Sequence, residues 1–133
     1  MTNTRVSDLE VLEKRFPILV KQFSIRHGSG GKGFHPGGDG AIRGFEARAK
    51  MTFSLSSERR VHRPYGMAGG EPGLSGRNLA LLKIPGAAAA SEGEGDRWVN
   101  VGGRGIVHLQ CGEQLYIFTP GGGGYGKSDL DLV

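Results

Sequence analysis

Apolar residues follow a clear helical period near the start of the chain, over residues 7–16. Three of them fall on one helical face at the spacing i, i+3 and i+7: Leu9, Leu12 and Phe16. Ser7 and Glu10 have the S-x-x-E spacing of a capping box, which stabilises a helix start by about 1 kcal/mol. Pro17 then prevents the helix from continuing. The pattern predicts one short amphipathic helix that needs a partner surface.

Beyond this helix the period changes from 3.6 to 2, which is typical of half-buried strands. The clearest alternation runs from Phe45 to Leu55 and predicts one long strand with a bulge or bend near residues 49–50. The other strand candidates are residues 23–26, 78–84, 98–101, 106–110 and 114–119. The last two flank residues 111–113 and predict a hairpin. Residues 114–119 are apolar on both faces, which predicts a central strand covered on both sides.

Composition completes the prediction of the fold class. Glycine supplies 25 of the 133 residues, against a typical usage of roughly 7%. It is concentrated in four loops: 28–40, 66–76, 102–105 and 121–126. Leu, Ile, Val and Phe still exceed the roughly 20% below which disorder is expected. We therefore expect a mostly β (α+β) fold, an antiparallel β-rich domain with one short N-terminal helix and long glycine-rich loops.

Charge and cysteine content exclude several classes of protein. The formal net charge is +4, but the 17 basic residues are interleaved with 13 acidic ones, so we expect no nucleic-acid partner. Cys111 is the single cysteine, which excludes an internal disulfide scaffold and fits a reducing compartment. No apolar run approaches the roughly 18–20 residues of a membrane span, and the N-terminus lacks the apolar core of a signal peptide. We expect a cytoplasmic protein with no membrane partner.

Two glycine loops match the G-x-G-x-x-G pattern, at residues 28–33 and 121–126. A dinucleotide site needs a helix directly after this pattern, because the helical amides hold the pyrophosphate. Phe34-His35-Pro36 cannot start such a helix, so the first match predicts tight turns instead. The four consecutive glycines at 121–124 indicate either tight backbone packing or a close approach to a ligand. The sequence leaves both interpretations open.

Arg59 and Arg60 lie just after the predicted long strand, where loops often carry functional sites. Their paired N–H donors suit a carboxylate or a phosphate. The alternative is that Glu58 pairs with an arginine at a subunit or domain contact. His35 and Asp39 have a spacing that suits two metal ligands, but an Asx-type turn at Asp39 explains it as well.

Cys111 stands directly before a glycine turn. We expect it to be a buried small hydrophobe, since no base partner for a nucleophile is identifiable.

The loops and their flanking residues also form an ordered series of motifs. These are Asn3-Thr4-Arg5, Leu12 to Pro17, Arg26 to Gly33, Gly37 to Gly40, Ser57 to Arg60, Pro64 to Gly66, Gly69 to Gly73, Asn100 to Gly103 and Thr119 to Gly126. In order and spacing they resemble the C-terminal region of the hydantoinase B/5-oxoprolinase family, over nearly the whole chain. The resemblance implies a C-terminal fragment of such a domain over residues 1–133, inactive alone, with 86–96 as a surface loop insertion.

The resemblance also implies a function. The family opens 5-oxo-L-proline to L-glutamate, or opens related cyclic amides, as ATP-dependent hydrolases of glutathione metabolism. ATP and Mg²⁺ would bind outside this segment, so no cofactor is expected in the fragment. The expected partners are the A-type ATP-binding part and the N-terminal B-type part, in a homo-oligomer when complete. The family's metal ligands lie upstream, so no metal ligand is assigned here.

Six residues are expected to bind substrate: Arg59, Arg60, Tyr65, Gly122, Gly123 and Tyr125. The catalytic residues are not identifiable in this segment. Two alternatives remain, a non-catalytic β-rich assembly module and an inactive fragment of a hydantoinase or ketone carboxylase-type subunit.

Overall fold

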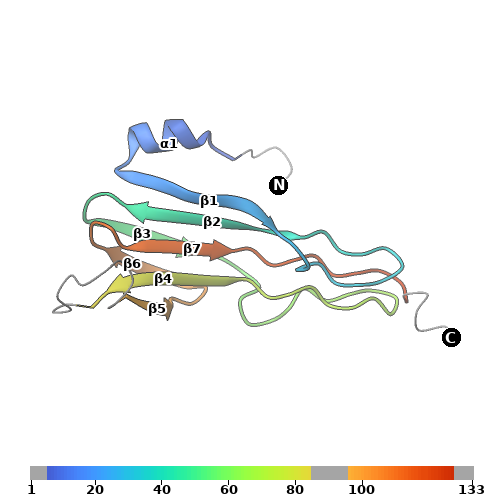
Figure 1. Cartoon of the computed structure of the whole chain (residues 1–133). Coiled ribbons are helices and arrows are strands. Elements are labelled where there is room, and N and C mark those ends of the chain that lie inside the picture. Colours follow the sequence, from blue (N-terminus) through green and yellow to red (C-terminus); the bar gives the residue numbers. More distant parts are fainter. Residues whose placement is uncertain (1–5, 85–95, 128–133) are drawn as a thin grey trace.

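The computed structural model describes residues 6–84 and 96–127. This part of the chain holds one short helix followed by seven strands (Figure 1). Their bounds are α1 (Leu9–Arg15), β1 (Ile18–Arg26), β2 (Gly40–Ala47), β3 (Met51–Ser56), β4 (Arg77–Lys83), β5 (Asp96–Asn100), β6 (Arg104–Leu109) and β7 (Gln114–Phe118). The mostly β prediction is confirmed. The predicted insertion at 86–96 lies, except for Asp96, outside the described residues.

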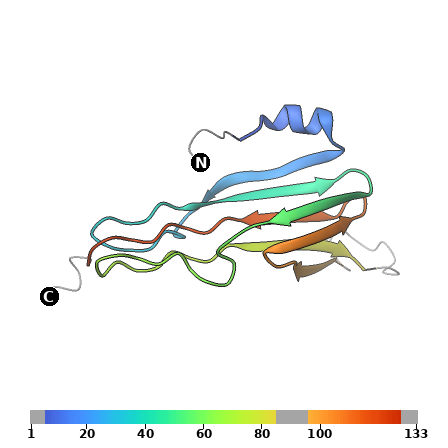
Figure 2. The same cartoon turned by 180° about the vertical axis from the view of Figure 1, so that it is seen from behind.

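The strands form two antiparallel sheets. Five of them pair in the order β1-β2-β7-β4-β5, and β3 pairs with β6 in a second, two-stranded sheet. Figure 2 shows this smaller sheet lying across one face of the larger one. The buried core between them consists of Ala47, Leu55, Ala80, Val107, Leu109 and Leu115. The opposite face of the five-stranded sheet has no second layer in the described part of the chain (Figure 1).

Helix α1 begins one residue later than predicted. Its N-cap is Asp8, whose carboxylate accepts hydrogen bonds from the amides of Glu10 at 2.9 Å and Val11 at 3.3 Å, so the expected Ser7 cap is wrong. A carboxylate satisfies these amides and interacts favourably with the positive end of the helix dipole. The Glu13 carboxylate accepts a hydrogen bond from the amide of Val20 at 2.8 Å, which connects the helix to β1.

The predicted strand from Phe45 to Leu55 is two strands in two sheets. The chain bends between Ala47 and Met51, close to the predicted bend. The amide of Arg48 donates to the carbonyl of Pro17 at 2.7 Å, and the amide of Ala47 donates to the carbonyl of Glu113 at 2.9 Å. These contacts end the pairing of β2 and direct β3 onto the other side of the core. A continuous alternation therefore serves both layers.

The predicted hairpin of β6 and β7 is also wrong. The two strands are joined by a tight turn in which Gly112 has a φ of 84°, but β6 pairs with β3 and β7 lies between β2 and β4. The Glu113 carboxylate is buried and accepts the amides of Lys83 at 2.9 Å and Gln110 at 2.7 Å, which fixes the turn as a connection between sheets. The central place of β7 is confirmed. However, the face of β7 that carries Tyr116 and Phe118 is only half-buried in this chain.

Candidate functional site

Three glycine-rich segments continue beyond one end of the five-stranded sheet and run side by side (Figure 1). They are the β1–β2 connection, the β3–β4 connection and the chain after β7. Backbone hydrogen bonds join all three: the amide of Gly31 donates to Gly122 at 2.8 Å, that of Glu71 to Lys32 at 2.7 Å, and that of Gly124 to Glu71 at 2.9 Å. We call this arrangement, residues 28–39, 64–76 and 119–126, the loop bundle.

Close backbone packing explains most of the glycines in the loop bundle. A Cβ atom added at Gly121 would overlap the carbonyl of Ser29, and one at Gly123 would overlap the carbonyl of Tyr65. A Cβ at Gly31 would overlap the carbonyl of Glu71 in the same way. Glycine is required where one backbone touches another in this manner. Of the two interpretations of the glycine run at 121–124, the structure supports tight backbone packing.

The first G-x-G-x-x-G loop is filled by a side chain of its own chain. The Asp39 carboxylate accepts the amide of Gly30 at 2.8 Å and that of Gly28 at 3.2 Å. The hydrogen bond from the Gly30 amide is the main reason that the pKa of Asp39 lies below its usual range. Loss of solvent contact raises this pKa, whereas the amides of Gly28 and Ser29 and the charge of His27 lower it further. The amides of Gly28 and Gly30 already donate to Asp39, and the residues that follow the loop form no helix. The loop therefore does not fit a nucleotide phosphate.

This arrangement predicts a pH dependence. Because the pKa of Asp39 is lower in the folded chain than in the unfolded chain, its ionised form stabilises the fold above the unfolded pKa, roughly 3.9. That stability is lost as the pH falls through the folded pKa. Asp39→Asn should therefore flatten the pH dependence of urea unfolding below about pH 4. Asp8→Asn at the helix cap is the comparison, and an unchanged profile for Asp39→Asn would contradict the assignment.

Four of the six predicted substrate-binding residues line one surface hollow of about 330 Å³. These are Arg59, Tyr65, Gly123 and Tyr125, and the rest of the described lining is Pro64, Met67 and Gly124. The Arg59 guanidinium carbon lies 5.8 Å from the centroid of the Tyr65 ring, a cation–π arrangement. Arg59 also has a φ of 58°, which aims its side chain differently from that of its neighbour. A cation, two phenols and the glycine backbone of residues 123–124 thus line one hollow.

The structure does not bring Arg60 or Gly122 into this hollow. Arg60 turns inward, where Nη1 donates to the carbonyl of Glu58 at 2.7 Å and Nη2 donates to Oδ1 of Asn78 at 3.0 Å. Burial lowers the pKa of Arg60, and the charge of Arg26 lowers it further. Gly122 instead links two segments of the loop bundle through its own amide and carbonyl.

Glu58 contacts neither Arg59 nor Arg60 with its carboxylate. It pairs with Arg104 at the start of β6. The side chain of Arg59 thus lines the hollow, while Arg60 holds the loop that carries it. Pro64, Met67 and Gly124 were not among the predicted substrate-binding residues, although Pro64 and Gly124 lie within the motifs named above. A bridge between Met67 and Tyr125 brings the two segments together, and residue types alone gave no sign of it.

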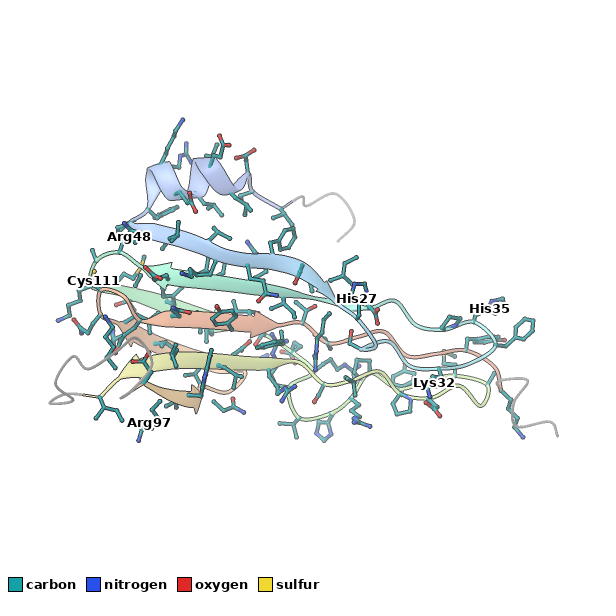
Figure 3. The ribbon with its side chains drawn as sticks, in the orientation of Figure 1. His27, Lys32, His35, Arg48, Arg97 and Cys111 are labelled. Carbon is teal, nitrogen blue, oxygen red and sulfur yellow. The ribbon has the colours of Figure 1, made fainter. Side chains whose placement is uncertain are left out.

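Of the two interpretations of His35 and Asp39, the structure does not support a pair of metal ligands. His35 lies near the tip of the loop bundle, where its backbone pairs with that of Tyr125 (Figure 3). The carboxylate of Asp39 instead lies 3.8 Å from Nδ1 of His27. Among the residues with described positions, no three His, Cys, Asp or Glu side chains gather where they could hold a metal.

No helix of this part of the chain is long and apolar enough to cross a membrane.

Cys111 is exposed, so the expectation of a buried hydrophobe is wrong. Its Sγ donates to the carbonyl of Arg48 at 3.2 Å, far from the loop bundle (Figure 3). A second hollow, of about 450 Å³, also lies at this opposite end of the sheet. Its charged lining residues are Lys83, Arg97 and Glu113, and it contains none of the six predicted residues.

Comparison with known proteins agrees with the order of motifs along the chain. The family model for hydantoinase B/oxoprolinase matches residues 1–128. The chain is 44% identical to 5-oxoprolinase 1 of Arabidopsis thaliana over 128 residues, which is 96% of this chain and 9% of that protein. It is 46% identical to 5-oxoprolinase of Saccharomyces cerevisiae over 118 residues, 89% of this chain and 8% of that protein.

A more distant relative is the putative B subunit of a D-/L-hydantoinase from a Pseudomonas species. It is 26% identical over 126 residues, covering 94% of this chain and 20% of that protein. The chain thus spans about a tenth of the length of its more similar relatives. Since the family match extends over almost all of its residues, the chain belongs to the hydantoinase B/oxoprolinase family.

Proposed function

We propose that the chain works as part of a 5-oxoprolinase, an ATP-dependent hydrolase that opens 5-oxo-L-proline to L-glutamate in the cytoplasm as a step of glutathione metabolism. The observation that carries this proposal is the contrast in identity, 44% and 46% to two proteins named 5-oxoprolinase against 26% to a putative hydantoinase B chain. The same contrast disfavours a hydantoinase-type protein. In this proposal ATP and Mg²⁺ bind elsewhere in the complete protein; the amides of Gly28 and Gly30 are already engaged by Asp39.

The hollow beside Arg59 suits the carboxylate of a small cyclic amide. A guanidinium offers two parallel N–H donors to a carboxylate, and the phenols of Tyr65 and Tyr125 can hydrogen-bond to polar atoms of the ring. Pro64 and Met67 present apolar surface to its methylene groups. The described lining holds no carboxylate, imidazole or thiol. This site therefore contributes binding and orientation, and the acid–base chemistry belongs to other parts of the protein.

A hybrid enzyme tests the function. In it, this chain replaces the matching segment of the Saccharomyces cerevisiae 5-oxoprolinase. We expect glutamate formation that requires both 5-oxo-L-proline and ATP. Preferential opening of hydantoin, or a soluble hybrid without turnover, would contradict the proposal.

Arg59→Ala in the hybrid should raise KM for 5-oxo-L-proline about tenfold or more, since a charge-assisted hydrogen bond contributes roughly 1.5–3 kcal/mol. We expect a smaller change in kcat, because the interaction with the carboxylate is made equally in the ground state and the transition state. Arg63→Ala, a nearby exposed arginine outside the described lining of the hollow, is the matched control. An unchanged KM for Arg59→Ala removes Arg59 from the site.

A further inference from the structure

The face of the five-stranded sheet that points away from β3 and β6 carries a row of aromatic side chains. The centroids of the Trp98 and Tyr116 rings are 5.5 Å apart, and Tyr116 stacks on Phe118 at 6.5 Å. The strand register places three half-buried aliphatic residues on the same side: Ile42, Leu79 and Leu81. We call these six residues the aromatic face. Trp98 is 54% exposed, and no described element lies in front of the face in Figure 1.

Gly44 on β2 lies opposite Tyr116 and leaves room for the Tyr116 ring. A Cβ added there would lie 2.6 Å from Cε1 of Tyr116, so the Tyr116 ring lies directly over the β2 backbone. Tyr116 thus packs against the sheet, whereas the Trp98 ring is inclined by 63° to that of Tyr116. An aromatic and partly exposed surface is typical of the core of a protein–protein interface.

Two arginines flank one end of the aromatic face. Their guanidinium carbons lie 5.9 Å (Arg26) and 5.8 Å (Arg77) from the centroid of the Phe118 ring. Arg26 is only 9% exposed, and its Nη1 donates to the carbonyls of Ser75 and Thr119, both at 2.9 Å. Burial lowers the pKa of Arg26, and the charge of Arg77 lowers it further.

These two charges have no carboxylate partner among the described residues. The ion pairs found there join Lys21 with Glu46, His27 with Asp39, and Arg104 with Glu58. A buried cation next to a second cation is unfavourable unless an anion compensates both. One carboxylate placed beside Phe118 would satisfy this requirement.

The geometry points to an intramolecular interface: we propose that the aromatic face is covered by the larger part of the family protein, through a segment that places an aspartate or glutamate carboxylate against Arg26 and Arg77. The chain spans 8–9% of two of its 5-oxoprolinase relatives, so most of such a protein lies outside these residues. Strand β7 is apolar on both faces, a pattern typical of strands buried on both sides. The proposal rests on family membership and not on the identity of the substrate.

A polypeptide segment fits this face better than a small ligand does. Neither of the two hollows described above includes a residue of the aromatic face, so a small anion would meet an open surface. Aromatic residues and arginine are also the side chains that most often dominate binding at protein interfaces.

The chain has a single tryptophan, Trp98, which makes the aromatic face directly observable. The chain is labelled with 5-fluorotryptophan and mixed with Saccharomyces cerevisiae 5-oxoprolinase lacking the matching 118 residues. We expect the single ¹⁹F resonance to shift on association. Arg77→Glu should raise the dissociation constant about tenfold or more. Arg97→Glu is the matched control, since Arg97 precedes Trp98 on β5 and strand alternation places its side chain on the other side of the sheet.

A hybrid enzyme with this chain in place of the matching segment provides a second measurement that does not depend on the folding of a truncated protein. Arg77→Glu should lower the melting temperature of the hybrid by several degrees more than it lowers that of the isolated chain. Arg97→Glu should shift both by similar amounts. Both experiments omit 5-oxo-L-proline and ATP, so their outcome is separate from that of the proposed function.

Three results would overturn the proposal. The first is association that leaves the ¹⁹F resonance unmoved. The second is an equal effect of Arg77→Glu on the hybrid and on the isolated chain. The third is a dimer of the chain alone that Arg77→Glu dissociates, which would assign the aromatic face to a second copy.

Discussion

Gly37→Ala is expected to destabilise the chain by about 3 kcal/mol. The new Cβ would lie within 2.6 Å of the carbonyl carbon of Gly122, backbone against backbone, so no side chain can move aside. The amide of Gly37 also donates to the carbonyl of Gly31 at 2.8 Å, and a shift of the segment would break this bond. Urea unfolding measures the loss, which corresponds to a fall of roughly 10 °C in Tm.

The adjacent residue provides a matched control. A Cβ added at Gly38 has no heavy atom within 4 Å, and neither Gly37 nor Gly38 has a φ in the left-handed region. Gly38→Ala should therefore leave stability unchanged or raise it by about 0.4–1 kcal/mol, because alanine restricts the unfolded chain. Equal effects of the two substitutions would show that backbone contact is not what the loop bundle requires of its glycines.

The elements of this fold could be predicted from the sequence better than their pairing. The strand candidates overlap observed strands, because the side chains of a half-buried strand meet the core on one face only, but the first halves of β1 and β2 were missed. The same alternation gave no sign that Ala47 and Leu55 stand in different sheets, since both reach one shared core. The error in joining β6 to β7 has a related cause: a short glycine turn suits a hairpin and a connection between sheets equally well.

The candidate site was predictable in part. Loop position and residue chemistry indicated Arg59, Tyr65, Gly123 and Tyr125, and the structure brings all four to one hollow. The different orientation of Arg60 could not be predicted, because it depends on the positive φ of Arg59 and on a buried amide eighteen residues further along the chain. Hydrogen bonds at such separations depend on the pairing of sheets, which local patterns do not determine.

That buried amide belongs to Asn78, which has no solvent-exposed surface. Its Nδ2 donates to Oγ of Ser57 at 2.9 Å and to the carbonyl of Gly102 at 2.7 Å, while its Oδ1 accepts from Arg60. The amide of Gly76 donates to the carbonyl of Arg59 at 2.9 Å. These bonds hold the chain on both sides of Arg59. The stability of this network therefore determines where the Arg59 guanidinium lies.

Asn78→Ala is expected to cost about 3 kcal/mol, because it removes three hydrogen bonds and leaves buried polar groups without partners. In the hybrid enzyme it should also raise KM for 5-oxo-L-proline, since Arg59 loses its support. Asn100→Ala is the control. Among the described residues its Oδ1 accepts a hydrogen bond only from the exposed amide of Gly102, at 3.0 Å, so its loss should cost less than about 1 kcal/mol. Combining Asn78→Ala with Arg60→Ala should cost less than the two separate losses, because the residues share one bond. Full additivity, or wild-type stability of Asn78→Ala, would show that Arg59 is positioned by other contacts.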